Sequence, residues 1–325
     1  MSDRYPLNPA PYPLRVGSRG SQLALWQANH IADKLRARGR EVSIEIIRTT
    51  GDVMQHLTFV QVGSKGMFTK EIEEALAENR IDLAVHSLKD LPTTLNDPFT
   101  IAAIPPRADP SDAFVSIQYE SFAAMPQGAR VGTSSLRRQA QLRAQRSDLE
   151  YIEFRGNVDT RLRKLAEGQV EAIILASSGL ERLGRIEHLR ERFPALILCP
   201  SAGQGALAIE TRADDAETIQ ALAFLDDPAT RFAVTAEREA LAALGGGCQV
   251  PIGIHCWATP HTYSILGVVA SPDGTSTLRA ELDCQYSEKP EVLGRKLAAH
   301  LIEQGAGPIL ALTEPAQLQT GIAAP

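Results

Sequence analysis

Apolar residues form two alternating patterns along the N-terminal part of this chain. Short apolar runs bounded by turn residues, typical of buried strands, occupy residues 14–17, 42–47, 83–85, 101–104, 130–132, 149–154 and 172–175. Between them, apolar residues recur at helical spacing over residues 23–35, 68–76, 136–145 and 158–167. Strands that alternate with helices build parallel or mixed sheets, and the pattern starts again after Pro126. We therefore predict two successive α/β units.

The pattern changes after Pro228. A helix is predicted from there to about Leu244, followed by strands over residues 252–257, 263–269 and 278–284 and a helix over residues 291–303. Pro272-Asp273-Gly274 has the composition of a hairpin turn between the last two strands. These elements predict a third, α+β unit with a three-stranded antiparallel sheet. A chain of 325 residues is long enough to form several cores.

Two segments have the composition of connections between units. Residues 104–110 contain three prolines and read as a linker, and residues 199–203 read as a return crossing. The motif Gly203-x-Gly205-x-x-Ala208 within the return fits a dinucleotide fingerprint, but it leads into a strand-like run over 206–209 rather than a helix. We therefore expect hinges here and no dinucleotide site.

Composition excludes several classes of protein. The net charge of −6 and the isoelectric point of about 5.7 argue against a nucleic-acid-binding protein. With no apolar run long enough to span a bilayer and no apolar N-terminal signal, we expect a cytoplasmic protein that binds no membrane. The seven histidines show no zinc spacing, and no C-x-x-C pair occurs, so we expect no metal and free thiols at Cys199, Cys248, Cys256 and Cys284.

Polar side chains follow the predicted strands. In the first unit these are residues 18–22, 49–52 and 86–92, and in the second unit 132–138 and 155–157. In open α/β sheets, ligands bind beyond the carboxyl ends of the strands. Hydroxyl groups at a helix start cap its free N–H groups, and the helix start favours an anion. We therefore expect an anion site at these strand ends.

A local excess of arginine supports that expectation. Residues 130–164 contain nine basic residues against four acidic ones, opposite to the sign of the whole chain. We interpret Arg143, Arg146 and Arg163 as solvated helix faces. The better-placed guanidinium groups, which bind carboxylates in a bidentate way, are Arg19, Arg137, Arg138, Arg155 and Arg161. Together with one acid, Asp90, they predict a polyanionic substrate and one proton-transfer group.

Three further signals leave alternatives open. Cys248 follows three glycines directly behind the predicted helix, where a thiol is either reachable by a large ligand or merely packs at a hinge. Residues 63–66 resemble a flap, with Lys65 contacting either an anion or solvent, and Phe68 either packs in the core or stacks on a ring. His86, after an apolar strand, is more typical of a hydrogen-bonded structural histidine than of a catalytic one.

The order of these motifs resembles the porphobilinogen deaminase family, also called hydroxymethylbilane synthases. The resemblance spans about residues 14–311 and rests on Arg19-x-Ser21-x-Leu23-Ala24-Leu25-x-Gln27, Ala84-Val85-His86-Ser87-x-Lys89-Asp90-x-Pro92, residues 131–138, Arg155-Gly156-Asn157 and Gly246-Gly247-Cys248. The chain departs from the family pattern at Gln22, Gln61 and Ser64, which puts only the flap contacts in doubt.

The resemblance implies two periplasmic-binding-protein-like (type II) α/β domains joined by two crossings, plus a C-terminal α+β domain that carries the cysteine. The expected division is residues 12–105 with 206–225 for the first domain, 111–199 for the second and 228–313 for the third, with tails at 1–11 and 314–325. A monomer is also implied.

The activity implied is the head-to-tail joining of four porphobilinogen molecules, with loss of ammonia, onto a dipyrromethane cofactor linked through a thioether to Cys248. Water then releases hydroxymethylbilane. Asp90 is implied as the catalytic residue. Cofactor and substrate binding are implied for Arg19, Ser21, Lys65, Phe68, Ser87, Lys89, Thr133, Ser134, Ser135, Arg137, Arg138, Arg155, Gly156, Arg161, Arg182 and Gln204.

Two other classes of protein remain as alternatives. The same two-domain architecture serves non-catalytic anion-binding proteins, which would leave Cys248 unmodified. A cysteine-nucleophile hydrolase would need a histidine base beside Cys248, and His255 is near it only in sequence.

Overall fold

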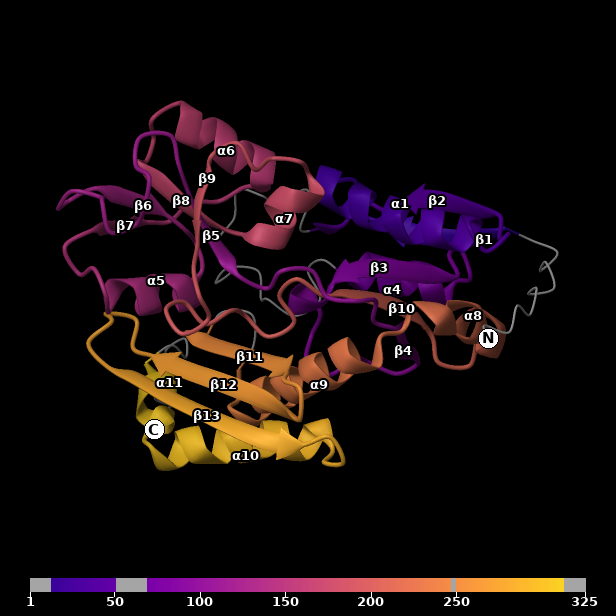
Figure 1. Cartoon of the computed structure of the whole chain (residues 1–325). Coiled ribbons are helices and arrows are strands. Elements are labelled where there is room, and N and C mark those ends of the chain that lie inside the picture. The colour runs from indigo at the N-terminus through magenta and orange to yellow at the C-terminus, as the bar shows by residue number, and fades with distance from the viewer. Residues whose placement is uncertain (1–12, 51–68, 247–249, 313–325) are drawn as a thin grey trace, which may run out of the picture.

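Three β-sheets organise the molecule (Figure 1). The structure is a computed structural model that describes residues 13–50, 69–246 and 250–312. Two five-stranded mixed sheets come from the N-terminal two thirds of the chain, and a three-stranded antiparallel sheet comes from the C-terminal third. The expected class, two α/β units followed by an α+β unit, is therefore confirmed.

The first sheet has the strand order β2-β1-β3-β10-β4. Its strands are β1 (Leu14–Ser18), β2 (Val42–Ile46), β3 (Leu83–Ser87), β4 (Phe99–Ala103) and β10 (Leu207–Arg212). Its helices are α1 (Gln22–Arg36), α4 (Lys70–Ala77), the 3-10 turn η1 (Leu88–Asp90), α8 (Ala216–Leu222) and η2 (Ala223–Leu225). β1 runs parallel to β2 and β3, whereas β10 runs antiparallel to both β3 and β4.

The second sheet has the order β7-β6-β8-β5-β9. Its strands are β5 (Asp112–Ser116), β6 (Arg130–Gly132), β7 (Glu150–Ile152), β8 (Ala172–Ala176) and β9 (Leu189–Arg192). Its helices are α5 (Leu136–Arg143), α6 (Val158–Ala166) and α7 (Ser177–Arg182). β6 runs parallel to β7 and β8, and β5 runs antiparallel to β8 and β9.

Both sheets share one topology. If the three parallel strands of each unit are counted in chain order, they lie side by side in the order second, first, third. Next to the third strand lies the strand that the chain forms on entering from the other unit, and the remaining strand lies at the edge of the sheet. The arriving strands are β10 in the first sheet and β5 in the second, and each follows a chain crossing. This arrangement explains why the sequence pattern starts again after Pro126 and why the first unit is discontinuous in sequence.

The third sheet packs against two helices. β11 (Ile252–Ala258), β12 (Thr262–Ala270) and β13 (Thr277–Gln285) form a meander. One face is covered by α9 (Pro228–Ala243) and α10 (Pro290–Glu303), with α11 (Ala306–Ala311) at the end of the chain (Figure 1). Buried Leu293, Leu297 and Leu301 recur at helical spacing and pack with Ile254 and Ile265 in one core. The predicted hairpin turn is present between β12 and β13.

The two crossings are tied to the third unit by a buried ion pair. Arg107, in the first crossing, donates through Nη1 and Nη2 to both carboxylate oxygens of Glu237 on α9, at 2.6 and 3.1 Å. The backbone N–H of Gly203, in the return crossing, donates to the same carboxylate at 2.7 Å. Gly205 has φ +85, and a Cβ there would lie 2.5 Å from the carbonyl oxygen of Ala108, so only glycine lets the crossings approach this closely.

The sequence pattern missed two strands. β5 and β9 were not predicted, and β10 is longer than the run predicted over residues 206–209. β9 has the sequence Leu-Arg-Glu-Arg and lies at the sheet edge, where charged side chains are tolerated because only one side of the strand is paired.

Candidate active site

The turn that follows β3 carries the acid expected to be catalytic. β3 passes directly into η1, where Leu88 is fully buried and Asp90 is exposed. Leu88 therefore anchors the turn while the Asp90 carboxylate stands clear of the sheet end. This is the position at which open α/β sheets place ligand-binding groups.

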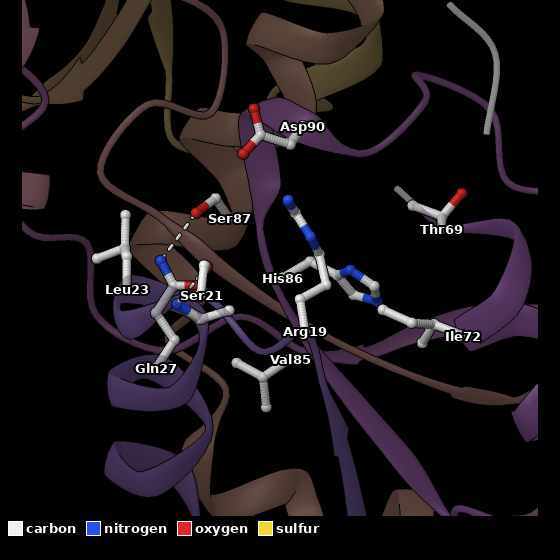
Figure 2. A pocket seen from close by; sticks show the side chains of 11 residues that line it. Arg19, Ser21, Leu23, Gln27, Thr69, Ile72, Val85, His86, Ser87 and Asp90 are labelled. Carbon is white, nitrogen blue, oxygen red and sulfur yellow. Dashed lines mark hydrogen bonds between the residues drawn. The ribbon is translucent and has the colours of Figure 1, made fainter. Parts of the chain in front are cut away.

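A pocket opens beside this turn (Figure 2). Its lining residues are Arg19, Ser21, Leu23, Ala24, Gln27, Thr69, Ile72, Val85, His86, Ser87 and Asp90. The Ser21 hydroxyl caps α1 by accepting the N–H of Ala24 at 3.3 Å. Gln27 Nε2 donates to Ser87 Oγ at 2.8 Å, which fixes the end of β3 against α1. In Figure 2 the Arg19 side chain points toward the Asp90 carboxylate. The structure thus brings four of the predicted site residues together.

The start of α5 presents two buried arginines over one buried acid. Arg137 Nη1 donates to Asp112 Oδ2 at 2.7 Å, and Arg138 donates through Nε and Nη2 to Asp112 Oδ1 at 3.0 and 2.6 Å. Burial by itself would raise the pKa of Asp112, but the charges of and hydrogen bonds from the two arginines lower it well below its usual range. Asp112 therefore stays ionised and orients both guanidinium groups.

The predicted hydroxyl groups before α5 shape this loop. Ser135 caps the helix by accepting the N–H of Arg138 at 3.4 Å, and Thr133 Oγ1 accepts the N–H of Ser135 at 3.3 Å. Ser134 Oγ accepts the N–H of Phe154 at 3.1 Å, which holds the loop against the end of the neighbouring strand. These contacts pre-form the helix start beside the two arginines.

Further cations lie around this helix start. Arg161 Nε donates to the carbonyl oxygen of Gly156 at 2.7 Å, and Arg155 pairs with Glu153 at 2.5 Å. Burial, together with repulsion from Arg138 and Arg155, lowers the pKa of Arg161 to about 10. The guanidinium of Arg161 is therefore desolvated, and no carboxylate of the described residues offsets the lowering of its pKa.

Lys89 and Gln204 connect the two sheet ends. Gln204 Nε2 donates to Asp112 Oδ1 at 2.9 Å, and Gln204 Oε1 accepts from Lys89 Nζ at 3.2 Å. Burial lowers the pKa of Lys89 to about 8; Asp90 opposes the shift and Arg138 adds to it. The turn of the first unit and the arginine pair of the second therefore act on each other electrostatically. We name Lys89, Arg137, Arg138, Arg155 and Arg161 the cation cluster.

Arg182 lies beside the return crossing rather than in the cation cluster. Its Nη2 donates to the carbonyl oxygen of Gly205 at 2.7 Å, and its Cζ lies 5.8 Å from the ring centre of Trp26 on α1. Burial lowers the pKa of Arg182 to about 10, with Glu181 opposing. Arg182 therefore bridges α7 and α1, on opposite sides of the site.

The interpretation of two arginines as solvated was wrong. Arg146 donates to the carbonyl oxygens of Phe122 and Met125 and pairs with Asp148, so it holds the loop that precedes β6. Arg143 donates to the carbonyl oxygen of Pro272 in the third unit at 2.7 Å. Arg163 is exposed, as expected, and pairs with Glu167.

Three predicted site residues, Cys248, Lys65 and Phe68, lie outside the described residues. What the structure does show is the end of the helix that leads to the cysteine. Gly245 has φ +70 after α9, and the N–H of Gly246 donates to the carbonyl oxygen of Leu241 at 2.9 Å, which terminates the helix.

The sequence missed Asp112 as a site residue. It begins a strand that was not predicted, and its two arginine partners lie 25 and 26 positions further along the chain. The only local signal is an acid directly before the apolar run Ala113-Phe114-Val115 at the end of the linker.

Other predictions concern cysteines, metals and histidine. Cys199, Cys256 and Cys284 are free and buried. Over residues 13–50, 69–246 and 250–312, no cluster of metal-ligating side chains occurs. In the same part of the chain, no helix has the length and apolar character that a bilayer crossing requires.

His86 is buried and hydrogen-bonded, as expected, to Glu210 at 2.9 Å.

The fold and the site together define a protein with two α/β units, in which an acid on the turn after β3 lies next to a cluster of basic side chains that spans the two sheet ends. Two sequence models match the chain. One, the "dipyromethane cofactor binding domain" of porphobilinogen deaminase, matches residues 14–220, and the other, the C-terminal domain of porphobilinogen deaminase, matches residues 231–303. The chain belongs to the porphobilinogen deaminase family.

Individual relatives agree with the family models. A porphobilinogen deaminase of Desulforudis audaxviator is 51% identical over 298 residues, covering 91% of this chain and 96% of the relative. That of Nitratidesulfovibrio vulgaris is 47% identical over 304 residues, covering 92% and 96%. Family membership confirms the expected class of enzyme, in tetrapyrrole biosynthesis, and the expected dipyrromethane cofactor. The non-catalytic alternative is not favoured.

Solved structures with similar shape include binding proteins. The methionine binding protein MetQ has 14% identity and a TM-score of 0.43, covering 65% of this chain and 89% of that chain. A nutrient binding protein of Burkholderia cenocepacia bound to methionine has 13% identity and a TM-score of 0.40, covering 64% and 89%.

Proposed function

We propose that this chain joins four porphobilinogen molecules head to tail onto a dipyrromethane carried by Cys248 and releases hydroxymethylbilane. Ammonia leaves at each coupling, and water ends the cycle. The observation that carries the proposal is the cation cluster next to Asp90: Lys89 is its neighbour on the same turn and interacts electrostatically with Asp90, Arg137 and Arg138. A growing chain of pyrroles with acetate and propionate side chains accumulates negative charge, which such a cluster binds.

Asp90 is the acid–base and charge-stabilising residue of this proposal. It ends a turn that is anchored by buried Leu88, and it lines the pocket with Arg19. A carboxylate in this position can accept hydrogen bonds from pyrrole N–H groups and stabilise the cation formed when ammonia leaves. Arg19 points toward it (Figure 2). In this proposal the Arg19 guanidinium binds a substrate carboxylate beside the reacting atoms.

The cation cluster binds the side-chain carboxylates. Within the described part of the chain, Arg137 makes its hydrogen bonds through Nη1 alone, to Asp112 and to the carbonyl oxygen of Cys199. Its Nε and Nη2 are therefore left for a bound carboxylate. The guanidinium of Arg161 is desolvated and repelled by Arg138 and Arg155, so a bound anion stabilises it in the same way. Arg155, Lys89, Arg182, Gln204 and the polar groups at the start of α5 and at Gly156 complete the proposed binding set.

The residues present fit the dipyrromethane cofactor, because its carboxylates match a donor set that is rich in arginine. When bound, the cofactor supplies the terminal pyrrole carbon to which substrate units are added. Cys248 would hold it and the cation cluster would bind its acidic side chains. Lys65 and Phe68 belong to the same proposal.

The domain division, location and assembly are part of the proposal. We take residues 12–105 with 206–225, 111–199 and 228–313 as three domains that act as a cytoplasmic monomer without nucleic acid or membrane. The three described cysteines are free, which is typical of a reducing compartment, and the net charge of −6 disfavours nucleic acid. Light scattering of the eluting protein tests the monomer, and a dimer mass contradicts it.

The mass of the denatured protein and of the peptide that contains Cys248 tests the central claim. The expected result is a covalent increment of two linked pyrroles on that peptide, absent from a Cys248→Ala variant. A Cys284→Ser variant, which changes a buried thiol of the third unit, is the control and keeps the increment. An unmodified Cys248 that stays unmodified after incubation with porphobilinogen contradicts the proposal and favours an anion-binding protein.

A further inference from the structure

A buried histidine–glutamate pair lies under the pocket, and the proposed function leaves it unused. His86 on β3 and Glu210 on β10 lie on the same face of the first sheet, since His86 is paired with Ala208 and Glu210 with Ala84. His86 Nε2 and Glu210 Oε2 are 2.9 Å apart. Glu210 is 0% exposed, and His86 is 8% exposed and lines the pocket with Arg19 and Asp90 (Figure 2).

Among the described residues, Glu210 forms an ion pair with no lysine or arginine. Arg212, the next residue of β10 on the same face, donates to the carbonyl oxygens of Leu76 and Ile81 and pairs with Asp215 and Asp82. Glu210 Oε1 is buried and, among the described residues, has no hydrogen-bond partner. A buried carboxylate without a counter-charge is costly, so this one is stabilised whenever its single partner, His86, becomes positively charged.

The pair also bears on the histidine tautomer. With Glu210 ionised, its oxygens only accept hydrogen bonds, and the 2.9 Å contact then requires the proton of neutral His86 to lie on Nε2. Nδ1 then keeps its lone pair. Among the described residues Nδ1 makes no hydrogen bond, and the His86 side chain lines the pocket. A carboxylate behind an imidazole whose other nitrogen faces a site is the arrangement of a general base.

We propose that His86, held by Glu210, accepts at Nδ1 the proton that each coupling step releases. This inference rests on the proposed function. In that step, the aminomethyl C–N bond of protonated porphobilinogen breaks and its electron pair leaves with nitrogen as ammonia. The α-carbon of the acceptor pyrrole forms the new C–C bond to the methylene carbon and loses its hydrogen as a proton, which moves to Nδ1. The imidazolium is then stabilised by the Glu210 carboxylate and returns its proton to solvent.

A second base removes a conflict between two tasks of Asp90. Asp90 must stay negative to stabilise the cation that forms when ammonia leaves. A carboxylate that also took up the released proton would be neutral when the next cation forms. His86 separates the two tasks, because Asp90 holds negative charge at one wall of the pocket while His86 takes the proton at another.

The first experiment reads the tautomer in the wild-type protein. Protein labelled with 15N at the histidine ring nitrogens gives one set of signals for each histidine, and a His86→Gln variant assigns those of His86. The expected neutral form carries its proton on Nε2, with Nδ1 unprotonated. In a Glu210→Gln variant the amide can donate or accept, so this preference weakens. A proton on Nδ1 in the neutral wild-type protein overturns the proposal.

The second experiment separates kcat from KM. Glu210→Gln, nearly the same in shape, is expected to lower kcat by about 10–100-fold with KM within about twofold, because it removes orientation and charge support from the base. His86→Gln is expected to lower kcat by about 100-fold or more. Thr211→Val is the matched control. Thr211 is the next residue of β10, is fully buried and points to the other face, so kcat should not change.

The outcomes are distinguishable from failure of the proposed function. Wild-type-like kcat in both Glu210→Gln and His86→Gln overturns the inference while leaving the function intact, since Asp90→Ala would still stall turnover. No turnover by wild-type protein that carries the cofactor would contradict the function itself. A Glu210→Gln variant without a cooperative thermal transition is unfolded, and its kcat then carries no information. In that case the tautomer of His86 in the wild-type protein tests the proposal: a proton on Nε2 supports it and one on Nδ1 overturns it.

Discussion

The two α/β units share a strand order but use the ends of their strands in opposite ways. In the first unit, β3 ends in an exposed acid, Asp90, beside a pocket. In the second unit, charge gathers after the first strand instead: β6 leads into α5, where two buried arginines cover one buried acid, Asp112. One unit therefore presents a reactive carboxylate, and the other presents positive charge that is held in place.

This difference shows how a repeated scaffold divides chemistry from binding. An exposed carboxylate can change its partners during a reaction, whereas a carboxylate fixed by two guanidinium groups cannot. Asp112 instead serves as a fixed counter-charge. It orients Arg137 and Arg138 and, through Gln204, reaches Lys89 at the other sheet end. Four predictions sharpen this comparison.

The largest effect is expected for the exposed acid. Asp90→Ala should fold with an unchanged thermal transition, because Asp90 is exposed, and should lose about 10²–10⁴-fold in kcat for porphobilinogen consumption. Asp214→Ala, at another exposed acid on the first unit, should keep its activity. Wild-type turnover by Asp90→Ala would sink the catalytic assignment.

The buried acid should show the opposite behaviour, with a loss of stability. Asp112→Asn leaves two buried arginines without their shared negative charge, and we expect the free energy of unfolding in urea to fall by about 3–5 kcal/mol. Asp148→Asn removes the partner of Arg146 at an exposed position and should leave the free energy of unfolding nearly unchanged. Equal losses for the two variants would contradict a special role for Asp112.

Lys89 should give the site a pH dependence. Because burial lowers its pKa to about 8, the ammonium is charged below that pH and becomes neutral above it. Attraction for carboxylates is lost with the charge, so kcat/KM, which reports the free enzyme, should fall above about pH 8. Lys89→Arg keeps its charge and should retain kcat/KM to higher pH. The same decrease of kcat/KM at high pH in the wild-type protein and in Lys89→Arg would show that Lys89 does not cause the pH dependence.

The smallest effect is expected for the contact between α1 and α7. Arg182 stands over the Trp26 ring, which is 36% exposed. Trp26→Leu keeps apolar bulk but removes the ring, and we expect it to cost about 0.5–1 kcal/mol in the free energy of unfolding. Arg38 over the exposed Phe224 ring offers a control pair within the first unit. A loss several times larger for Trp26→Leu would mean that the two units depend on this contact for folding.

Local pattern was sufficient to predict most of the fold. The strands β1, β3, β6 and β8 were predicted because most of their side chains are buried, so each appears in the sequence as an apolar run. Helix starts were visible where a hydroxyl precedes an apolar stretch, as at Ser21 and Ser135. The edge strand β9 was not visible, because its charged sequence becomes a strand only through pairing with β5.

Part of the candidate site was also predicted from the local sequence pattern. Asp90, Ser87 and Lys89 were predicted because they directly follow a strand, and Arg137 and Arg138 because they open a helix. The position of an arginine in the sequence did not predict whether its side chain is exposed to solvent or hydrogen-bonded within the fold. Arg146 was assigned to a solvated face, yet it holds three carbonyl oxygens of a loop that precedes it by more than 20 residues.

The residues alone were enough to predict the succession of two α/β units and one α+β unit, the strand ends that carry polar side chains and the resemblance to a family. Which distant polar and charged groups meet depends on how the chain folds. Asp112 joins Arg137 across 25 positions, Lys89 joins Gln204 across 115, and His86 joins Glu210 across 124. Hydrophobic periodicity is a local property that fixes elements, whereas the pairing of buried charges depends on which strands become neighbours, and the chain crossings set that order.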